Sequence, residues 1–326
     1  MRAIVSRGPG GPEVLEVTNT ASPVPGPGQA LIDVHAAGVN FLDIYQRRAG
    51  LGPILGNEGA GIVRALGPGA DDPDGKLHPG TRVAWVLARG AYAEQAAVDV
   101  ADLVAVPDAL DLDIAAAILL QGLTAHYLAH DVYAIKPGDS IVVHSAAGGV
   151  GQLLIQYARA QGAALIIGTI STVAKATAAR AAGAHKVIIR DHEDFLSAVL
   201  RLTMDEGVHV VFDGIGAATY EAGLEAIRRR GTLVLFGQAS GQPGPIDPER
   251  LAAAGSIYVT QTRLGAFIAT RDELLARSSA LFDDTLAGTI APAAPRRYAL
   301  RDAAEAHRAL ESSTTTGKLI LVPDPR

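Results

Sequence analysis

The chain has 326 residues, of which 48% are hydrophobic and 19% charged, the composition of an ordinary globular protein long enough for two domains. Its net charge of −6 at pH 7 argues against nucleic acid or an anionic membrane surface as the main partner. It contains no cysteine, which excludes disulfides, cysteine-based zinc sites and a thiol nucleophile.

The first five residues lack the apolar core of a signal peptide. No run of about twenty apolar residues that could span a membrane is evident either. The absence of cysteine fits a reducing compartment. We therefore expect a cytoplasmic enzyme that acts on a small molecule, with neither nucleic acid nor a membrane as partner.

The first 120 residues are rich in glycine and proline and hold several short runs of high β propensity. Turn residues separate these runs, for example at residues 25–28 and 67–69. Short strands at this spacing predict a compact, barrel-like β domain. The predicted strands cover residues 30–36, 61–66, 82–87 and 91–98.

The pattern changes near residue 113, where alanine, isoleucine and leucine become frequent. Asp113 is predicted to be the N-cap of a helix, because its side chain can accept the first free N–H groups. A second helix is predicted over residues 123–132.

From residue 138 onward, near-continuous apolar runs alternate with helical stretches, which predicts a parallel sheet covered by helices on both faces. Six such strands make a full Rossmann sheet. Residues 270–326 carry one or two further helices and a β run at 318–322, which we expect to return to the first domain. The predicted strands are residues 140–144, 164–169, 186–189, 209–213, 232–236 and 256–261. The predicted helices are residues 152–161, 173–182, 195–203, 219–226 and 248–253.

The most informative stretch is residues 140–151, where an apolar run ends in a turn of small residues and a helix follows at once. Such a turn presents free backbone N–H groups and the positive end of the helix to a diphosphate. Alanine stands at the first position of the glycine fingerprint, Ala146, and glycine at the other two, Gly148 and Gly151. The residues expected at the diphosphate are Ala147, Gly148, Gly149, Val150 and Gly151.

The end of the second Rossmann strand distinguishes NAD from NADP, because a carboxylate there binds the ribose 2′-hydroxyl and repels a 2′-phosphate. Residues 168–172 hold no acid. Ser171, Lys175 one turn later and Arg190 at the end of the third strand suit a phosphate dianion. We therefore predict NADPH as the cofactor. The alternative is that Lys175 and Arg190 are solvated surface charges.

Three further motifs, at residues 36–43, 56–63 and 236–241, accompany the glycine fingerprint. With them the chain resembles the zinc-independent NADPH:quinone oxidoreductases, the relatives of zeta-crystallin in the medium-chain dehydrogenase/reductase superfamily. The resemblance implies an α/β protein with a GroES-like β-barrel catalytic domain, residues 1–121 and 265–326, and a six-stranded parallel Rossmann domain, residues 122–264. It also implies a homodimer joined edge to edge through the last Rossmann strand, near residues 256–262.

The resemblance also bears on metal binding, because the zinc relatives hold a catalytic metal on a cysteine, a histidine and a third residue. Those three places are occupied here by Asn40, Asn57 and Gln121. Neutral amides are poor zinc ligands. A reaction without a metal is therefore expected.

By resemblance, Asn40 and Tyr45 lie beside the nicotinamide and are the expected catalytic residues, while Thr124 lies under the ring. Alternatively, Tyr45 is an aromatic packing residue and Asn40 a turn amide. Asp43 is expected to cap a helix or position a neighbour rather than act as a base. The other residues expected to bind the cofactor are Phe236, Gly237, Ser240, Arg263 and Lys318.

The expected reaction is direct hydride transfer from NADPH to a quinone or another conjugated, electron-poor acceptor. The product anion is stabilised by its own conjugation, so a hydrogen bond from Asn40 and a proton from Tyr45 or water suffice. An enone or alkenal double-bond reductase on the same scaffold is the nearest alternative. A non-catalytic, crystallin-like protein that binds NADPH is another.

Overall fold

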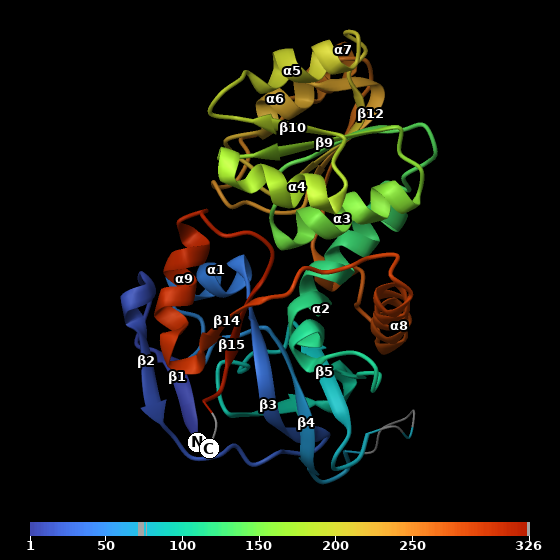
Figure 1. The fold of residues 1–326 in the computed structure, drawn as a ribbon. Coiled ribbons are helices and arrows are strands. Elements are labelled where there is room, and N and C mark those ends of the chain that lie inside the picture. The colour runs from blue at the N-terminus through green and yellow to red at the C-terminus, as the bar shows by residue number, and fades with distance from the viewer. Residues whose placement is uncertain (71–74, 76, 325–326) are drawn as a thin grey trace. The chain divides into compact units, whose positions relative to one another are not determined.

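The computed structural model describes residues 1–70, 75 and 77–324, and the chain divides into two units. Unit 1 comprises Met1–Leu123, Ile268–Ala287 and Pro292–Arg326, and unit 2 comprises Thr124–Phe267 and Gly288–Ala291. Unit 1 therefore contains the first strand of the chain and its last described residues (Figure 1). An ion pair of 2.9 Å between Arg2 Nη1 and Asp324 Oδ2 joins them.

Unit 1 is built on a seven-stranded sheet in the order β14-β15-β3-β4-β5-β7, with β6 also paired to β3. Neighbouring strands are antiparallel except β14 and β15, which are parallel. A separate antiparallel pair is formed by β1 (Arg2–Ser6) and β2 (Leu15–Asn19). The sheet strands are β3 (Gln29–Val39), β4 (Glu58–Leu66), β5 (Arg82–Val86), β6 (Gln95–Asp99), β7 (Leu103–Ala105), β14 (Arg296–Ala299) and β15 (Leu319–Val322).

The predicted β domain is confirmed, and so is the return of the C-terminal β run, since Leu319 of β15 pairs with Val39 of β3. The run predicted at residues 91–98 is shorter, because β6 begins at Gln95. The backbone before it is used elsewhere: Tyr92 N–H donates to Leu55, and its carbonyl accepts from Ile4 of β1. A fully buried core that includes Trp85 and Ile32 packs beneath these strands.

The helices of unit 1 lie at the ends and margins of this sheet. Asn40, which follows β3, is the N-cap of α1, and the carboxylate of Asp43 in the first turn accepts the Asn40 N–H at 2.8 Å. The expectation that Asp43 serves a helix cap is therefore confirmed. The helices and turns are η1 (Pro12–Val14), α1 (Phe41–Ala49), η2 (Val100–Asp102), α8 (Arg271–Ala287), η6 (Leu300–Asp302) and α9 (Ala303–Glu311).

Helix α2 (Leu112–Tyr127) corrects two predictions, because it runs without a break into a π turn, η3 (Leu128–Val132). Gly122 lies just before the second predicted helix and allows close packing: a Cβ there would lie 2.5 Å from Leu281 Cδ1 of α8. Asp113 is not the N-cap; the carboxylate of Asp111 accepts the Asp113 N–H instead.

Helix α2 and the turn after it, Leu112–Val132, are long and apolar enough to cross a membrane by length and composition alone. Such a segment was not predicted from the sequence. However, 72% of its most apolar stretch is buried inside the protein, as in the core helix of a globular fold.

Unit 2 is a six-stranded sheet in the order β10-β9-β8-β11-β12-β13, with every pair parallel. This is the strand order of a full Rossmann sheet, so the predicted fold class is confirmed. β12 starts five residues before the predicted position, because three consecutive arginines concealed its first half. The strands are β8 (Ser140–Val143), β9 (Leu165–Ile170), β10 (Lys186–Ile189), β11 (Val208–Asp213), β12 (Ile227–Leu235) and β13 (Tyr258–Gln261).

The five predicted helices of unit 2 are present and cover both faces of its sheet, with α3 and α4 on one side and α5, α6 and α7 on the other (Figure 1). The prediction placed the start of α3 three residues too late, because the glycines of the turn already belong to the helix. The helices and turns are α3 (Gly149–Ala160), η4 (Val173–Lys175), α4 (Ala176–Ala182), α5 (Phe195–Leu202), α6 (Tyr220–Glu225), α7 (Pro248–Ala253) and η5 (Leu264–Ala266).

Candidate active site

The glycine fingerprint forms a tight turn between β8 and α3. Ser145 has a left-handed backbone with φ of 54°, and its carbonyl accepts the N–H of Gly148 at 2.8 Å. Gly148 is the N-cap of α3 and, having no side chain, makes no side-chain cap. The first N–H groups and the positive end of α3 are therefore available to an anion at the carboxyl edge of the sheet.

Gly151 explains why the turn needs glycine at this position. A Cβ there would lie 2.4 Å from the Ser145 carbonyl oxygen and 2.9 Å from Ala146 Cα, and both are backbone atoms that cannot yield easily. The helix thus approaches the turn as closely as a dinucleotide fold requires. This close approach makes the turn fit a diphosphate.

The predicted 2′-phosphate residues gather where β9 and β10 end. The backbone N–H of Arg190, just after β10, donates to Ile170, the last residue of β9, and Ser171 follows directly. Half-burial and the nearby charge of Arg190 both lower the pKa of Lys175, which shows that the two cations are close. Arg190 Nε is buried and has no hydrogen-bond partner among the residues that the structure describes. The corner therefore fits a phosphate.

The loops after β11 and β12 are fixed to one another at the same edge of the sheet. Ser240 Oγ donates to the Ile215 carbonyl at 2.8 Å and accepts the Ala218 N–H at 3.0 Å. A Cβ at Gly237 would lie 2.5 Å from the Gly214 carbonyl. Phe236 and Gly237 are half-buried in this loop. The predicted residues 236–240 thus form a rigid rim on which a ligand could lie.

Two other predicted residues belong to unit 2. Thr124 is buried on α2. Arg263, which follows β13, is exposed and borders a hollow of about 320 Å³. The hollow is lined by Leu235, Gln242, Pro243, Gly244, Ile246, Val259, Gln261 and Arg263.

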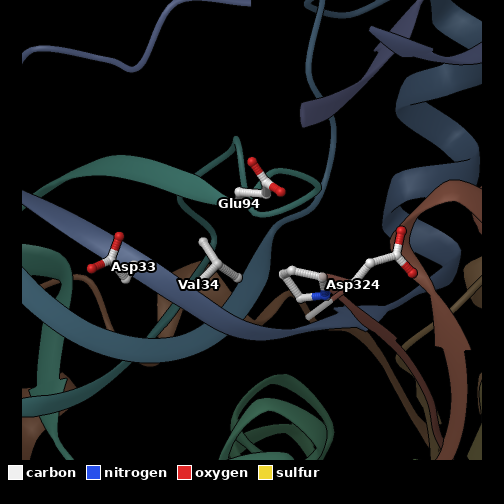
Figure 2. Close-up of a pocket in the computed structure, with 5 residues that line it drawn as sticks. Asp33, Val34, Glu94 and Asp324 are labelled. Atoms are coloured by element: carbon white, nitrogen blue, oxygen red, sulfur yellow. The ribbon is translucent and has the colours of Figure 1, made fainter. Parts of the chain in front are cut away.

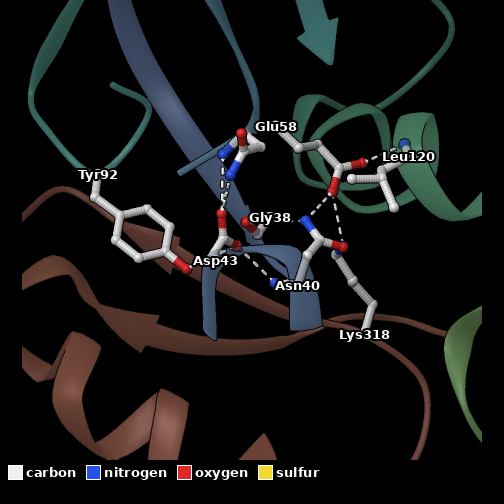
Figure 3. A network of polar contacts seen from close by, with 8 residues as sticks. Gly38, Asn40, Asp43, Glu58, Tyr92, Leu120 and Lys318 are labelled. Atoms are coloured by element: carbon white, nitrogen blue, oxygen red, sulfur yellow. Dashed lines mark hydrogen bonds and ion pairs between the residues drawn. The ribbon is translucent and has the colours of Figure 1, made fainter. Parts of the chain in front are cut away.

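In unit 1 the structure brings together Asn40, Glu58 and Lys318 in a buried polar cluster (Figure 3). Lys318 Nζ lies 2.6 Å from Glu58 Oε2 and 2.6 Å from Asn40 Oδ1. Asn40 Nδ2 donates to Glu58 Oε2 at 3.0 Å. Each member thus contacts the other two, and the amide of Asn40 is held at both ends.

The Glu58 carboxylate is held in place by contacts beyond the cluster itself. Its other oxygen, Oε1, accepts the backbone N–H of Leu120 in α2 at 2.7 Å (Figure 3). Gly38 makes room for the carboxylate, since a Cβ there would lie 2.1 Å from Glu58 Oε2 and 2.6 Å from the Ala116 carbonyl. The sequence reading assigned Glu58 no role, although an acid that opens an apolar strand is a signal for a buried, paired carboxylate.

A second buried network is centred on Asp43, whose carboxylate accepts from Asn57 Nδ2 at 2.6 Å and from the Tyr92 hydroxyl at 3.1 Å. Tyr92 Oη lies 3.0 Å from His307 Nε2, and His307 Nδ1 lies 2.9 Å from Arg47 Nη1. Arginine can only donate, so Nδ1 accepts and Nε2 carries the proton of a neutral ring. His307 therefore donates to Tyr92, and Tyr92 donates to Asp43.

Burial shifts the pKa values of Asp43 and His307 in opposite directions. It raises the pKa of Asp43 to about 6, although hydrogen bonds from Asn57 and the Asn40 backbone act against it. It lowers the pKa of His307 to about 3, and the charge of Arg47 contributes to the same shift. Near neutral pH the network thus holds a carboxylate and a neutral imidazole.

The amides at the expected zinc positions are engaged within the protein. Asn40 contacts Glu58 and Lys318, and Asn57 contacts Asp43 and Gln46. Gln121 is half-buried on α2. Among the residues that the structure describes, no three His, Asp or Glu side chains gather as a metal site.

Tyr45 is half-buried on α1, and its ring lies 6.2 Å from that of Phe41, which is also compatible with the packing role. Asn40 and Lys318, which were expected beside the cofactor for separate reasons, are direct neighbours. The described contacts leave the catalytic role of Tyr45 a prediction.

A hollow of about 300 Å³ near the chain ends of unit 1 has acidic walls but no free acid (Figure 2). Glu94 and Asp324 both pair with Arg2, at 2.8 and 2.9 Å. Asp33 accepts from Gln95 at 2.7 Å. The hollow therefore offers no chemistry of its own. Its lining residues are Asp33, Val34, Glu94, Pro323 and Asp324.

Comparison with known proteins agrees with both units. Residues 26–108 match the alcohol dehydrogenase GroES-like domain, and residues 149–280 match the zinc-binding dehydrogenase family. The chain is 39% identical to a quinone oxidoreductase of Pseudomonas aeruginosa, over 96% of this chain and 97% of the relative. The chain belongs to the quinone oxidoreductases of the medium-chain dehydrogenase/reductase superfamily.

Two other members of the superfamily are similar over nearly their whole length. A 2-haloacrylate reductase of Burkholderia is 38% identical, with 99% of each chain covered. The crystal structure of Escherichia coli quinone oxidoreductase, solved with NADPH, superposes with a TM-score of 0.93 at 36% identity, over 99% of this chain and all of that one. The match thus includes both the fold and the order of its elements.

The opposite pKa shifts of Asp43 and His307 predict a pH effect on the free energy of unfolding. Between pH 4 and 6 the folded state holds more protons on Asp43 and the unfolded state holds more on His307. The protons held by folded Asp43 make the free energy of unfolding fall as pH rises, whereas those held by unfolded His307 make it rise, so the two effects offset each other. In His307→Gln only the effect of Asp43 remains. Relative to the parent, its stability should fall with pH by up to about 1.4 kcal/mol per pH unit.

Urea unfolding at pH 4, 5 and 6 measures this difference. The exposed His78→Gln is the matched control and should give a curve parallel to that of the parent. Equal slopes for the parent and His307→Gln would contradict the shifts.

Proposed function

We propose that the protein is an NADPH-dependent quinone oxidoreductase, which transfers a hydride to a quinone or a similar conjugated acceptor without a bound metal. The observation that carries the proposal is the Rossmann turn closed by Gly151 together with the basic corner of Lys175 and Arg190. The names of the relatives and the NADPH in the related Escherichia coli structure support it.

The residues proposed to bind the cofactor fall into three groups. The turn at residues 147–151 binds the diphosphate, and Ser171, Lys175 and Arg190 bind the 2′-phosphate. The loop after β12 supports the nicotinamide half. The residues proposed for that half are Asn40, Thr124, Phe236, Gly237, Ser240 and Arg263. When bound, NADPH supplies the hydride.

Within unit 1, the residues of the chain orient the acceptor and control its charge. The Asn40 amide is held by Glu58 and Lys318, so it presents a fixed dipole. Tyr45 delivers a proton to the reduced product, directly or through water. The amides of Asn40, Asn57 and Gln121 do not suit zinc, which supports a reaction without a metal.

An enone or alkenal double-bond reductase is the second candidate. The name of the Burkholderia relative, a 2-haloacrylate reductase, favours it, because haloacrylates contain a conjugated double bond. A protein that binds NADPH without turnover is the remaining alternative. The proposal further places the enzyme in the cytoplasm, with domains at residues 1–121 plus 265–326 and 122–264.

Steady-state NADPH oxidation tests the function. We expect faster turnover of 1,4-benzoquinone than of an α,β-unsaturated ketone such as 3-penten-2-one, because the quinone forms the more stabilised anion. Treatment with a chelator should leave the rate unchanged. Preference for the ketone would favour the double-bond reductase, and loss of activity that zinc restores would refute the metal-free reaction.

The basic corner predicts coenzyme preference. Lys175→Ala and Arg190→Ala should each weaken NADPH binding by about tenfold or more, because a hydrogen bond to a charged group contributes about 1.5–3 kcal/mol. NADH lacks the 2′-phosphate, so its affinity should change by less than about threefold. Fluorescence titration measures both constants, and the exposed Lys186→Ala is the control. Equal losses for the two coenzymes would contradict the assignment.

A homodimer through the edge strand β13 is part of the proposal. β13 stands at the edge of the Rossmann sheet, and its Tyr258 is 62% exposed, a large aromatic surface for a solvent-facing strand. Tyr258→Asp should convert the dimer to monomer in sedimentation equilibrium. The exposed Val17→Asp of unit 1 should leave it dimeric. A parent that is monomeric at every concentration would rule the dimer out.

A further inference from the structure

Lys318 carries a buried ammonium group with one donor to spare. Its side chain is 4% exposed, and it pairs with Glu58, which is fully buried. An ammonium has three N–H donors. Glu58 Oε2 and Asn40 Oδ1 accept two of them, and no other acceptor for Nζ exists among the residues that the structure describes. A buried donor without an acceptor is costly, so the third N–H suits a ligand oxygen.

The direction of Lys318 is fixed from two sides. Glu58 can only accept and the ammonium can only donate, which sets the orientation of the Asn40 amide between them. Leu120 holds the far oxygen of Glu58, so the carboxylate cannot turn away. The ammonium is therefore preorganised, as a group that stabilises transition-state charge must be.

We propose that Lys318 is a catalytic residue whose third N–H donates to the acceptor oxygen on which negative charge develops. The inference rests on the proposed function and assigns Lys318 to the acceptor, whereas the family resemblance led us to expect it at the cofactor. The donor interacts most strongly with charge that appears during the reaction, because the ammonium is buried and already in place.

The role of Lys318 follows from where the electrons and the negative charge go during hydride transfer. A hydride with its two electrons adds to one end of the conjugated acceptor, and the bond that held it on the coenzyme breaks. The coenzyme is oxidised and the acceptor is reduced to an anion whose charge lies on the carbonyl oxygen. Lys318 donates a hydrogen bond to that oxygen and keeps its proton, while water or Tyr45 later protonates the product.

The test removes the charge pair as a whole, since a lone buried charge would destabilise the fold. Glu58→Gln combined with Lys318→Met is compared with the parent for 1,4-benzoquinone, its monochloro and its 2,5-dichloro derivatives. We expect kcat for 1,4-benzoquinone to fall about 100-fold, as on removal of an oxyanion donor. The loss should shrink with each chlorine, because chlorine itself stabilises the anion. NADPH affinity from fluorescence titration should change by less than about threefold.

A control pair and a second variant separate this role from a structural one. Arg2→Met with Glu94→Gln removes a partly buried ion pair elsewhere in unit 1 and should not change the ratio of the three rates. Lys318→Arg keeps the charge pair and so protects the fold, but its planar group donates from a different point. Lys318→Arg should therefore also lower kcat, by a factor that shrinks with each chlorine on the quinone.

Three outcomes overturn the inference alone. An equal loss for all three quinones in either Lys318 variant indicates a structural role. A large loss of NADPH affinity assigns Lys318 to the cofactor. An unchanged rate shows that the third N–H is not used. A parent protein that binds NADPH but reduces neither quinones nor enones overturns the proposed function, and this inference with it.

Discussion

The buried ion pair between Glu58 and Lys318 is the interaction on which unit 1 depends. It joins the first residue of β4 to the chain just before β15, 260 residues apart, and Asn40 at the end of β3 completes the cluster. Removing two charges from water is costly, and only the added hydrogen bonds from Asn40 and Leu120 make the pair favourable. The C-terminal strand must therefore dock on β3 before the cluster exists, so folding and the candidate site are coupled.

The buried cluster and the dinucleotide turn each need a glycine at a point of close approach. At Gly38 a side chain would collide with the Glu58 carboxylate, and at Gly151 it would collide with the backbone of the preceding turn. Both sites thus use the space that a missing Cβ leaves. The motif made Gly151 predictable, because a helix that starts directly after a strand needs this approach. Gly38 carried no such signal, because the carboxylate that fills its space comes from another strand.

The sequence predicted most of the fold, since apolar runs and helical stretches alternate clearly from residue 138 onward. It failed where one helix, α2, continues through Gly122, which packs against Leu281, and where the arginines of β12 concealed the start of a strand. In the site, resemblance identified Asn40 and Lys318 separately. Their contact spans 278 residues, and no local pattern encodes it. The role of Glu58 was missed as well, although its place at the start of an apolar strand was a local signal for a buried, paired carboxylate.

The cations of the two candidate sites have different neighbours: a carboxylate lies beside Lys318, whereas another cation lies near Lys175. In unit 1 the ammonium of Lys318 is neutralised by a carboxylate 2.6 Å away, so it can act as a directed donor without attracting anions at random. In unit 2, burial and the charge of Arg190 both lower the pKa of Lys175, so the protonated form is less favoured than it is in water. The phosphate dianion proposed to bind between Lys175 and Arg190 would oppose this effect and raise the pKa of Lys175. Under that proposal, NADPH affinity is expected to weaken as pH rises towards that pKa.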